Sequence, residues 1–257
     1  MAGQYAHNLR IIPRIFNQPF KDYLALENLA MKNLVELIFP SRCIGCSQLG
    51  ISICSSCRKN WHPHIYHREL KVLGKRYPVI SAIEYSAIAS RVLLRAKEAN
   101  QAAADQLLIT AITHSLRYFV KNYGTGDLVA IPSRRTATRK RGRDFMQEVT
   151  SSVASFESVK TLKILQHQRV VKDQSQLNSQ QRSSNIAGAF SASIDLPNSA
   201  GQGNIGPLII VDDLVTTGAT LVEAIRALRT AGFTVIGAVT GAVANPYDKG
   251  VDFRKGT

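Results

Sequence analysis

The sequence predicts an α/β protein in which helices flank a mainly parallel sheet, preceded by a small cysteine-rich module. Two observations lead to this fold class. Short apolar segments typical of buried strands alternate with segments whose apolar residues recur at helical spacing. All four cysteines lie between residues 43 and 57, and the rest of the chain contains none. At 257 residues, the chain is long enough for one α/β domain of about 150 to 200 residues and a small appendage.

The composition is that of a globular protein with an excess of positive charge. Hydrophobic residues make up 45% and charged residues 19% of the chain, which argues against a disordered or fibrous protein. The net charge of +14 favours anionic partners such as nucleotides, pyrophosphate, nucleic acid or an acidic protein. No apolar run approaches the roughly 20 residues of a membrane span, and the first thirty residues lack a signal-peptide pattern. We therefore expect a cytoplasmic protein without a membrane span.

The four cysteines form a pattern typical of a structural zinc site. They are arranged as CxxC, seven residues, then CxxC, and two such turns can present four thiolates tetrahedrally to one Zn²⁺. A redox pair or disulfides would be the alternatives, but both suit a cytoplasmic chain less well. Nearby histidines could also ligate metal, although we interpret them as solvated linker residues: His62, His64 and His67. The expected zinc ligands are Cys43, Cys46, Cys54 and Cys57.

Composition shifts suggest four parts of the chain. Pro63, Gly74, Pro78 and several basic residues lie within residues 62–78, a stretch that we interpret as a connector. Before the cysteines, the first residues are interpreted as an extension, either disordered or upstream of a native start at Met31. The expected parts are an extension at 1–30, a zinc-ribbon module at 31–66, the main domain at 75–245 and a tail at 246–257.

Within the main domain, strand and helix patterns alternate. The helix expected at 101–120 places five apolar residues on one side, namely Leu107, Leu108, Ile112, Leu116 and Phe119. A weaker helix is expected at 144–156 and a clearer one at Thr220–Arg229. The expected strands are 79–85, 127–132, 162–165, 207–213 and 233–239.

Two segments between these elements are too polar or too small-residue-rich to bury. Residues 166–185 are rich in Gln, Ser and Asn, so we expect a long mobile loop of the kind that often covers an active site. Residues 191–206 suggest a surface turn. Gly201, Gly203 and Gly206 give the spacing GxGxxG, but they precede a strand, whereas a dinucleotide-binding motif follows one.

The most informative segment is 207–232, PLIIVDDLVTTGATLVEAIRALRTAG. An apolar strand ends in two acids, crosses a loop of small residues and enters a helix at the sheet edge where α/β folds bind ligands. Backbone N–H groups and hydroxyls from Thr216 to Thr220 would suit a phosphate at the helix N-terminus, and Gly218 permits close approach. Asp212 and Asp213 would accept hydrogen bonds from sugar hydroxyls or hold a metal ion.

The string VDDLVTTGAT resembles the signature with which type I phosphoribosyltransferases bind phosphoribosyl pyrophosphate (PRPP). The resemblance implies a type I phosphoribosyltransferase-like fold and Mg²⁺ as the cofactor bound with PRPP. It also implies a set of PRPP-binding residues that spans the acids and the loop. These are Asp212, Asp213, Val215, Thr216, Thr217, Gly218, Ala219 and Thr220.

A wider resemblance, over about residues 34–244, is to the ComF family, which joins a short zinc ribbon to such a domain. LIFPSRCIGC is similar to the opening of that family. AIPSRRTATRKRGRDF and RVVKDQSQLNSQQRSSNIAGAF are similar to two of its internal segments. The chain departs from the family pattern after Gly142, where Arg143, Asp144 and Phe145 replace the common Phe-Asn-Gln.

This resemblance implies further site residues. Ser133, Arg134 and Arg135 would contact the leaving pyrophosphate, for which paired arginines are suited. A solvated basic turn or a nucleic-acid patch is the alternative, because basic residues continue through Arg139, Lys140, Arg141 and Arg143. Lys97 would reach the same pyrophosphate site. The polar loop would act as a lid through Arg169, Lys172, Gln174 and Arg182, each of which is equally compatible with simple solvation.

Two functions follow from these observations. The first is binding of PRPP or a related ribose phosphate, with transfer of the phosphoribosyl group to a nitrogen acceptor. The second is a non-catalytic adaptor with a sensing or vestigial PRPP site, because the ComF resemblance implies DNA uptake in competence. Its partners would be single-stranded DNA and a helicase or recombination mediator, for which the basic run is suited.

Overall fold

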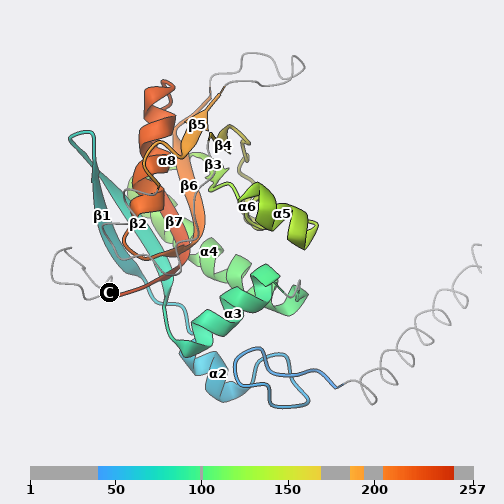
Figure 1. Cartoon of the computed structure of the whole chain (residues 1–257). Helices are drawn as coiled ribbons and strands as arrows, with labels where there is room; N and C mark the ends of the chain where they lie inside the picture. The colour runs from blue at the N-terminus through green and yellow to red at the C-terminus, as the bar shows by residue number, and fades with distance from the viewer. Residues whose placement is uncertain (1–39, 99–100, 169–185, 194–204, 246–257) are drawn as a thin grey trace, which may run out of the picture.

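The structure, a computed structural model, describes residues 40–98, 101–168, 186–193 and 205–245. These residues form a five-stranded sheet of order β1-β2-β7-β6-β3 and a separate pair, β4-β5 (Figure 1). β1 is antiparallel to β2, whereas the β2–β7, β7–β6 and β6–β3 pairs are parallel. The strands are β1 Tyr66–Val72, β2 Lys75–Glu84, β3 Asp127–Ala130, β4 Leu165–His167, β5 Phe190–Ala192, β6 Leu208–Val215 and β7 Val235–Val243.

Helices cover both faces of the sheet and enclose two cores. The helices are α2 Ser55–Asn60, α3 Ala87–Glu98, α4 Ala102–Tyr123, α5 Arg135–Arg141, α6 Phe145–Glu157 and α8 Ala219–Thr230. α3, α4 and α6 pack on one face, and α8 with the β4-β5 pair packs on the other. Ile209 and Ile210, neighbours on β6, contribute to opposite cores, as successive strand residues must. The predicted fold class, a mainly parallel sheet flanked by helices, is confirmed.

Close packing of α4 onto the sheet depends on small residues in β7. A Cβ at Gly237 would lie 2.6 Å from a ring carbon of Phe119, a fully buried residue of α4. α4 therefore crosses the central strand at a distance that larger side chains would prevent. The expected helix at 101–120 corresponds to α4, with Leu108, Ile112 and Leu116 buried as predicted.

The interpretation of residues 62–78 as a connector is wrong. Residues from 66 onward form the hairpin of β1 and β2, which extends the main sheet. Buried residues alternate with less buried ones around its turn, at Leu70, Val72, Tyr77 and Val79, and β2 is then buried continuously from Val79 to Ile83. The prolines and basic residues obscured this period-two pattern in the sequence. The proposed domain limits themselves remain predictions.

Other elements differ from expectation in smaller ways. The strand expected at 162–165 begins later, at Leu165. α3 and α5 were not anticipated. The predicted extension at 1–30 and tail at 246–257 lie outside the described residues. Nowhere in the described ranges does a helix combine the length and apolar character needed to cross a bilayer.

The cysteine module continues the core of the main domain. Cys43, Ile44 and Trp61 are buried in the same cluster as Ala89 and Val92 of α3. A module this small cannot form a core of its own, and here it shares one. Its position relative to α3 is therefore fixed by packing.

Candidate functional site

Two buried acids lie near the carboxyl end of β6. Asp212 and Asp213 are 8% and 5% exposed, and an Asp212 carboxylate oxygen accepts a hydrogen bond from the Asp213 N–H at 2.9 Å. Lys97, in the last turn of α3, places its Nζ 2.5 Å from Asp213 Oδ2. The structure thus brings Lys97 to the acids, whereas its expected role in pyrophosphate binding remains a prediction.

The two acids and Lys97 form a charged cluster in which one ammonium group faces two carboxyl groups. Burial raises the pKa of Asp212 well above its usual value, and the charge of Asp213 raises it further, while Lys97 opposes this shift. Burial lowers the pKa of Lys97, but the Asp213 carboxylate raises it by more, so that the net pKa of Lys97 is raised. Two buried carboxylates compensated by one ammonium group would gain from a second cation or from donating hydroxyls. The residues present therefore fit Mg²⁺ bound with a sugar.

The small-residue loop follows directly. Val215 is buried at the end of β6, and Gly218 is the N-cap of α8 with φ of +83°. A Cβ at Gly218 would lie 2.6 Å from a methyl carbon of Leu70 in β1. Glycine is thus favoured by both the left-handed backbone and the close approach of β1. Thr217 Oγ1 accepts a 3.4 Å hydrogen bond from the Ala219 N–H.

Arg68 of β1 holds the outer side of this loop and was missed in the sequence. Its guanidinium donates to the backbone carbonyls of Thr216 and Thr217, the latter at 3.0 Å. In a trans peptide the C=O and N–H point in opposite directions. The N–H groups of Thr217 and Gly218 therefore point away from Arg68. In the sequence, the alternation of Leu70 and Val72 with charged residues was the one signal that could have placed Arg68 on a strand.

The predicted pyrophosphate segment lies at the same sheet edge. β3 is paired parallel with β6 through Ala130 and Val211, and the Ile131 N–H donates to the Val211 carbonyl at 2.9 Å. Ser133 and Arg134 follow within a few residues, are half-buried, and lead into α5, which begins at Arg135. Their placement beside the acid end of β6 is compatible with pyrophosphate contact, which stays a prediction.

The basic run after this segment divides into two kinds of residue. Arg141 pairs with Glu98 at 2.7 Å, and Arg143 pairs with Asp105 at 2.7 and 3.0 Å. The guanidinium of Arg143 also donates to the Ala96 carbonyl at 2.7 Å. Arg139 and Lys140 are exposed on α5. Only part of the run is thus a solvated basic surface, and its inner arginines fasten α5 and α6 to α3 and α4.

The residues that depart from the family pattern have structural roles here. Arg143 forms the ion pair with Asp105 and lies with its guanidinium 5.1 Å from the ring centre of Phe145. Phe145 is fully buried at the start of α6. Asp144 is the N-cap residue of α6 and lies 3.4 Å from Lys163. These three positions stabilise the junction of α5 and α6.

The four cysteine sulfurs form a compact cluster. All lie within 4.8 Å of one another, and the Sγ atoms of Cys46 and Cys54 are 3.7 Å apart. Zn–S bonds of about 2.3 Å in a tetrahedron would separate the sulfurs by about 3.8 Å. A Cβ at Gly45 would lie 2.5 Å from the sulfur of Cys57, so the turn is tight. The donor set and its spacing fit Zn²⁺.

Their electrostatics agree with a site for a cation. Burial alone would raise the pKa of Cys43, but hydrogen bonds from backbone N–H groups, including that of Cys54 at 3.3 Å, lower it to about 6. Burial, together with the neighbouring thiols, raises the pKa of Cys57 to about 12. A bound Zn²⁺ would displace the remaining thiol protons.

The predicted lid residues Arg169, Lys172, Gln174 and Arg182 lie outside the described residues.

One family model matches part of the chain. The model of the phosphoribosyl transferase domain matches residues 138–252, which include the acids, the loop and α8. This segment is therefore similar to a phosphoribosyl transferase domain, in a chain whose fold is type I phosphoribosyltransferase-like. A comparison with curated proteins gives no match. The narrower resemblance to the ComF family remains a prediction.

Solved phosphoribosyltransferases are among the similar structures, all at low identity. An adenine phosphoribosyltransferase is 14% identical, with 74% of this chain and 91% of that one covered and a TM-score of 0.39. The Saccharomyces cerevisiae adenine enzyme, complexed with D-DIAB and adenine, is 12% identical over 69% and 83%, with a TM-score of 0.33. Mycobacterium tuberculosis H37Rv orotate phosphoribosyltransferase, complexed with Fe(III) dicitrate, is 11% identical over 73% and 91%, with a TM-score of 0.31.

Proposed function

We propose that the domain binds PRPP or a related ribose 5-phosphate with Mg²⁺ and transfers the phosphoribosyl group to a nitrogen acceptor. The observation that supports this most is the arrangement at the end of β6. Two buried acids, Asp212 and Asp213, precede by a few residues a glycine-containing loop that opens α8. Acceptors for sugar hydroxyls and donors for a phosphate are thereby placed next to each other.

Each part of the ligand would meet a different part of the site. Backbone N–H groups and hydroxyls of Thr216 to Thr220 would bind the 5-phosphate, helped by the positive end of the α8 dipole. Asp212 and Asp213 would accept hydrogen bonds from the ribose hydroxyls and would hold Mg²⁺ or its waters. When bound, Mg²⁺ would neutralise the charge of the pyrophosphate group. Ser133, Arg134 and Arg135 would contact that pyrophosphate.

In the proposed transfer, the bond between C1 of the ribose and the pyrophosphate oxygen breaks, and its electron pair leaves with pyrophosphate. A bond forms between C1 and the acceptor nitrogen, which loses a proton. The protein would contribute mainly by positioning the reactants and by stabilising the developing negative charge. Cys43, Cys46, Cys54 and Cys57 would hold Zn²⁺ as a structural ion outside this chemistry.

Calorimetric titration of the zinc-loaded protein with PRPP and Mg²⁺ tests the proposal. We expect micromolar binding by the wild type and a loss of at least about 100-fold in the double variant Asp212→Asn with Asp213→Asn, because each change replaces a carboxylate oxygen by an amide donor and removes a negative charge that would hold Mg²⁺. Glu157→Gln is the control and should bind normally, because it removes an acid at the C-terminal end of α6 that pairs with Arg117 of α4. A folded wild type that does not bind would refute the proposal.

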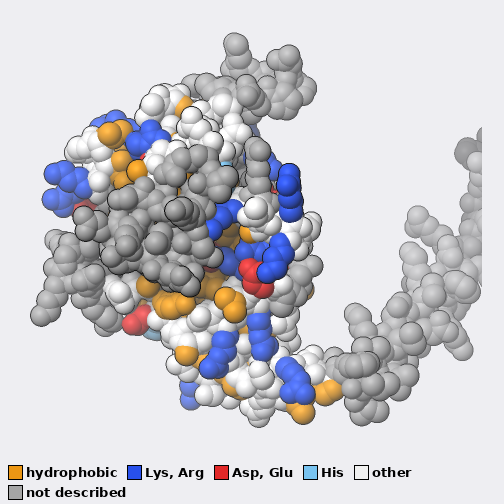
Figure 2. Space-filling model, in the orientation of Figure 1, with side chains coloured by type: hydrophobic (Ala, Val, Ile, Leu, Met, Phe, Trp, Pro, Cys, Tyr) orange, Lys and Arg blue, Asp and Glu red, His pale blue; other side chains and the backbone are white. Residues whose placement is uncertain are grey.

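A second function, an adaptor for single-stranded DNA, is favoured by the basic surface. Arg139 and Lys140 are exposed on α5 beside the candidate site, and the chain has a net charge of +14. Figure 2 shows lysine and arginine side chains spread over one face of the molecule. The ComF resemblance would make a DNA helicase or recombination mediator the protein partner and the cytoplasm the location, with the PRPP site acting as a sensor or surviving as a vestige.

Salt dependence of single-stranded DNA binding tests this second function. Arg139→Ala with Lys140→Ala should weaken binding and flatten the salt dependence by about 1.4 log units per log unit of salt, since each lost phosphate contact contributes about 0.7. Lys71→Ala with Lys75→Ala removes the same charge from the exposed end of the β1–β2 hairpin and serves as the control. Arg141 is unsuitable for this test because it pairs with Glu98. Equal effects of both double variants would contradict a specific surface on α5.

A further inference from the structure

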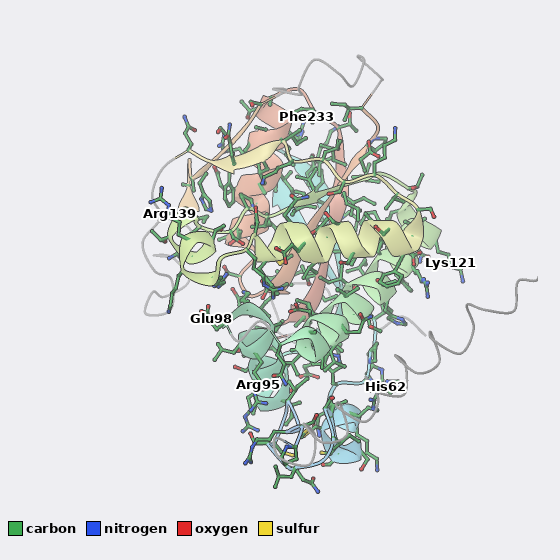
Figure 3. The ribbon with its side chains drawn as sticks, turned by 90° about the vertical axis from the view of Figure 1, so that its right-hand side faces the viewer. His62, Arg95, Glu98, Lys121, Arg139 and Phe233 are labelled. Carbon is green, nitrogen blue, oxygen red and sulfur yellow. The ribbon has the colours of Figure 1, made fainter. Side chains whose placement is uncertain are left out.

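α3 connects the cysteine module with the candidate ribose-phosphate site. The helix has 12 residues and is about 18 Å long at 1.5 Å per residue. Arg95 and Glu98 both lie in the last turn of α3, and Figure 3 shows Arg95 nearer to the sulfur atoms and Glu98 nearer to the segment that bears Arg139. One rigid element thus touches two sites that the sequence separates by more than 150 residues.

Two arginines bind α3 to the first cysteine turn. Arg91 donates a hydrogen bond to the Gly45 carbonyl. Arg95 donates to the Cys43 carbonyl at 3.3 Å and to the Ser47 hydroxyl at 2.9 Å. All three acceptors belong to the turn that contains Cys43 and Cys46, so the arginines bind the backbone whose shape a metal ion would fix.

The last turn of α3, which also contains Arg95, is held by a second group of contacts. Lys97 Nζ lies 2.5 Å from Asp213 Oδ2, and Glu98 pairs with Arg141 at 2.7 Å. The Lys97 side chain remains 32% exposed, so packing alone does not fix its position. Its contact with the acid depends on where α3 places its backbone.

We propose that the cysteine module positions Lys97 against Asp213 through α3, with Arg91 and Arg95 as the positioning residues. The module would then be part of the support of the anionic site, although none of its cysteines reaches that site. Loss of Zn²⁺, or oxidation of the cysteines, changes the turn that Arg91 and Arg95 bind. A displacement of about 1 Å at Lys97 is enough to break a charge-assisted hydrogen bond of this length.

A measurement without ligand tests the positioning itself. The reactivity of each lysine towards an acylating reagent can be followed by peptide mass spectrometry. An amine that is hydrogen-bonded to a buried carboxylate reacts slowly because this contact has to open before the nitrogen can attack the reagent. We expect Lys97 to react about five times faster in the variant Arg91→Met with Arg95→Met, and in chelator-treated wild type. Lys121, which is exposed on α4, is the internal reference and should react equally in all samples.

A binding measurement tests the consequence, and this arm rests on the proposed function. In zinc-loaded protein, the double arginine change should weaken ribose 5-phosphate or PRPP binding about tenfold. In a Lys97→Met background, the same change should alter the affinity less than about twofold, because the positioned group is already absent. Arg117→Met, an exposed arginine of α4 paired with Glu157, controls for loss of one guanidinium and should bind as the wild type does.

The outcomes separate the two proposals. Faster acylation of Lys97 without any ligand binding in the wild type supports the positioning and refutes the proposed function. Unchanged acylation in both the arginine variant and the chelated protein overturns the positioning, whatever the affinity. If the double variant does not fold with one Zn²⁺ bound, the single variant Arg95→Gln replaces it, because this variant keeps the Arg91 contact. The acylation rate of Lys97 in Arg95→Gln then tests the positioning in the same way.

Discussion

The two halves of the candidate site are built in different ways. The proposed phosphate loop, Thr216 to Thr220, is one continuous segment that runs from β6 into the start of α8, and the groups that would bind phosphate are mostly backbone N–H groups. The acid cluster is assembled from side chains of distant elements, with Lys97 from α3 meeting Asp213 of β6. The loop should therefore depend on backbone conformation, and the acid cluster on ion pairs that hold α3, α5 and α6 in place. Substitutions that affect one half without the other can test this difference.

The largest effect should come from Arg143→Met. The Arg143 and Asp105 side chains are 14% and 17% exposed, so the change leaves Asp105 largely buried without its bidentate partner. It also removes the donor to the Ala96 carbonyl beside Lys97. We expect a loss of about 3 kcal/mol in the free energy of unfolding, near the low end for a broken buried pair. Urea-induced unfolding measures this loss.

Two further variants define the cause of this loss. Asp105→Asn added to Arg143→Met should restore part of the stability, because the unpaired charge is then removed. Arg117→Met breaks an ion pair whose arginine is 68% exposed, and should change the free energy of unfolding by about 0.5 kcal/mol or less. Equal losses in Arg143→Met and Arg117→Met would show that the junction of α5 and α6 does not depend on its buried ion pair.

The phosphate loop should be most sensitive at Gly218. Gly218→Ala forces a Cβ onto a residue with φ of +83° and towards Leu70. A left-handed non-glycine residue costs about 1 to 2 kcal/mol, and a shift of the loop would weaken 5-phosphate binding as well. We expect thermal unfolding to reveal the first effect and calorimetry with ribose 5-phosphate the second.

Gly232→Ala is the matched control for this change. Gly232 lies just beyond the other end of α8, has φ of +90°, and has no atom within 4 Å of the position of a Cβ. The stability loss should therefore be similar or slightly smaller, while affinity for ribose 5-phosphate stays unchanged. A loss of affinity in both variants would mean that the loop responds to the stability of α8 in general and not to its own conformation.

The difference between the halves also explains what could be predicted from the sequence. The acids, Gly218 and the start of α8 lie within a short contiguous segment, so strand, loop and helix signals reinforced one another. α4 was predicted because its apolar period extends over several turns. The cysteine cluster was predicted from spacing, and its sulfurs lie close enough for one metal ion.

Features built by tertiary pairing could not be predicted in the same way. α3 carries arginines at positions that would ordinarily be solvated, and nothing local shows that Arg91 and Arg95 bind the cysteine turn. The basic run from Arg139 to Arg143 was equally typical of a solvated turn, whereas Arg143 pairs with Asp105, 38 residues earlier. β1 was obscured because its pattern is interrupted by charged residues on the outer side. Partners of long side chains depend on the fold and not on the neighbouring sequence.

The proposed phosphate loop also depends on one side chain that is distant in sequence. Arg68 of β1 orients the backbone of this loop. Arg68→Met removes both donors to the carbonyls of Thr216 and Thr217 and should weaken ribose 5-phosphate binding about tenfold, the effect of roughly one charged hydrogen bond. Arg68→Lys keeps the charge but cannot donate in the same forked geometry, so it should recover less than half of the lost binding free energy. Binding of pyrophosphate alone, measured by the same titration, should stay unchanged.

A full recovery by lysine would contradict this role. It would show that Arg68 acts through charge at a distance and not by orienting two carbonyls. A parallel loss of pyrophosphate binding would indicate that Arg68 supports the whole sheet edge. The matched control is Arg76→Met in β2, which removes a guanidinium that is 76% exposed and paired with Glu69.

The smallest effect has the opposite sign and concerns Asp212. Because its pKa is raised in the folded protein, folding favours its protonated form. Its contribution to stability is therefore lost as the pH rises from about 4, the usual pKa of an unfolded aspartate, through the raised folded value. Asp212→Asn keeps an oxygen that can accept from the Asp213 N–H and removes the buried charge. We expect it to raise the free energy of unfolding at pH 7 by about 1 kcal/mol, as often follows when a site residue is replaced.

Asp213→Asn is the comparison that makes this last prediction decisive. The two acids are adjacent and equally buried, but Asp213 is the one that pairs with Lys97. Its replacement removes the carboxylate partner of the Lys97 ammonium group and should lower stability at pH 7, while Asp212→Asn raises it. Urea unfolding of both variants at several pH values measures the two signs. A loss of stability in both would mean that Asp212 is held as a stabilising carboxylate, whereas opposite signs would show that one acid of the pair is kept at a cost in stability because the site requires it.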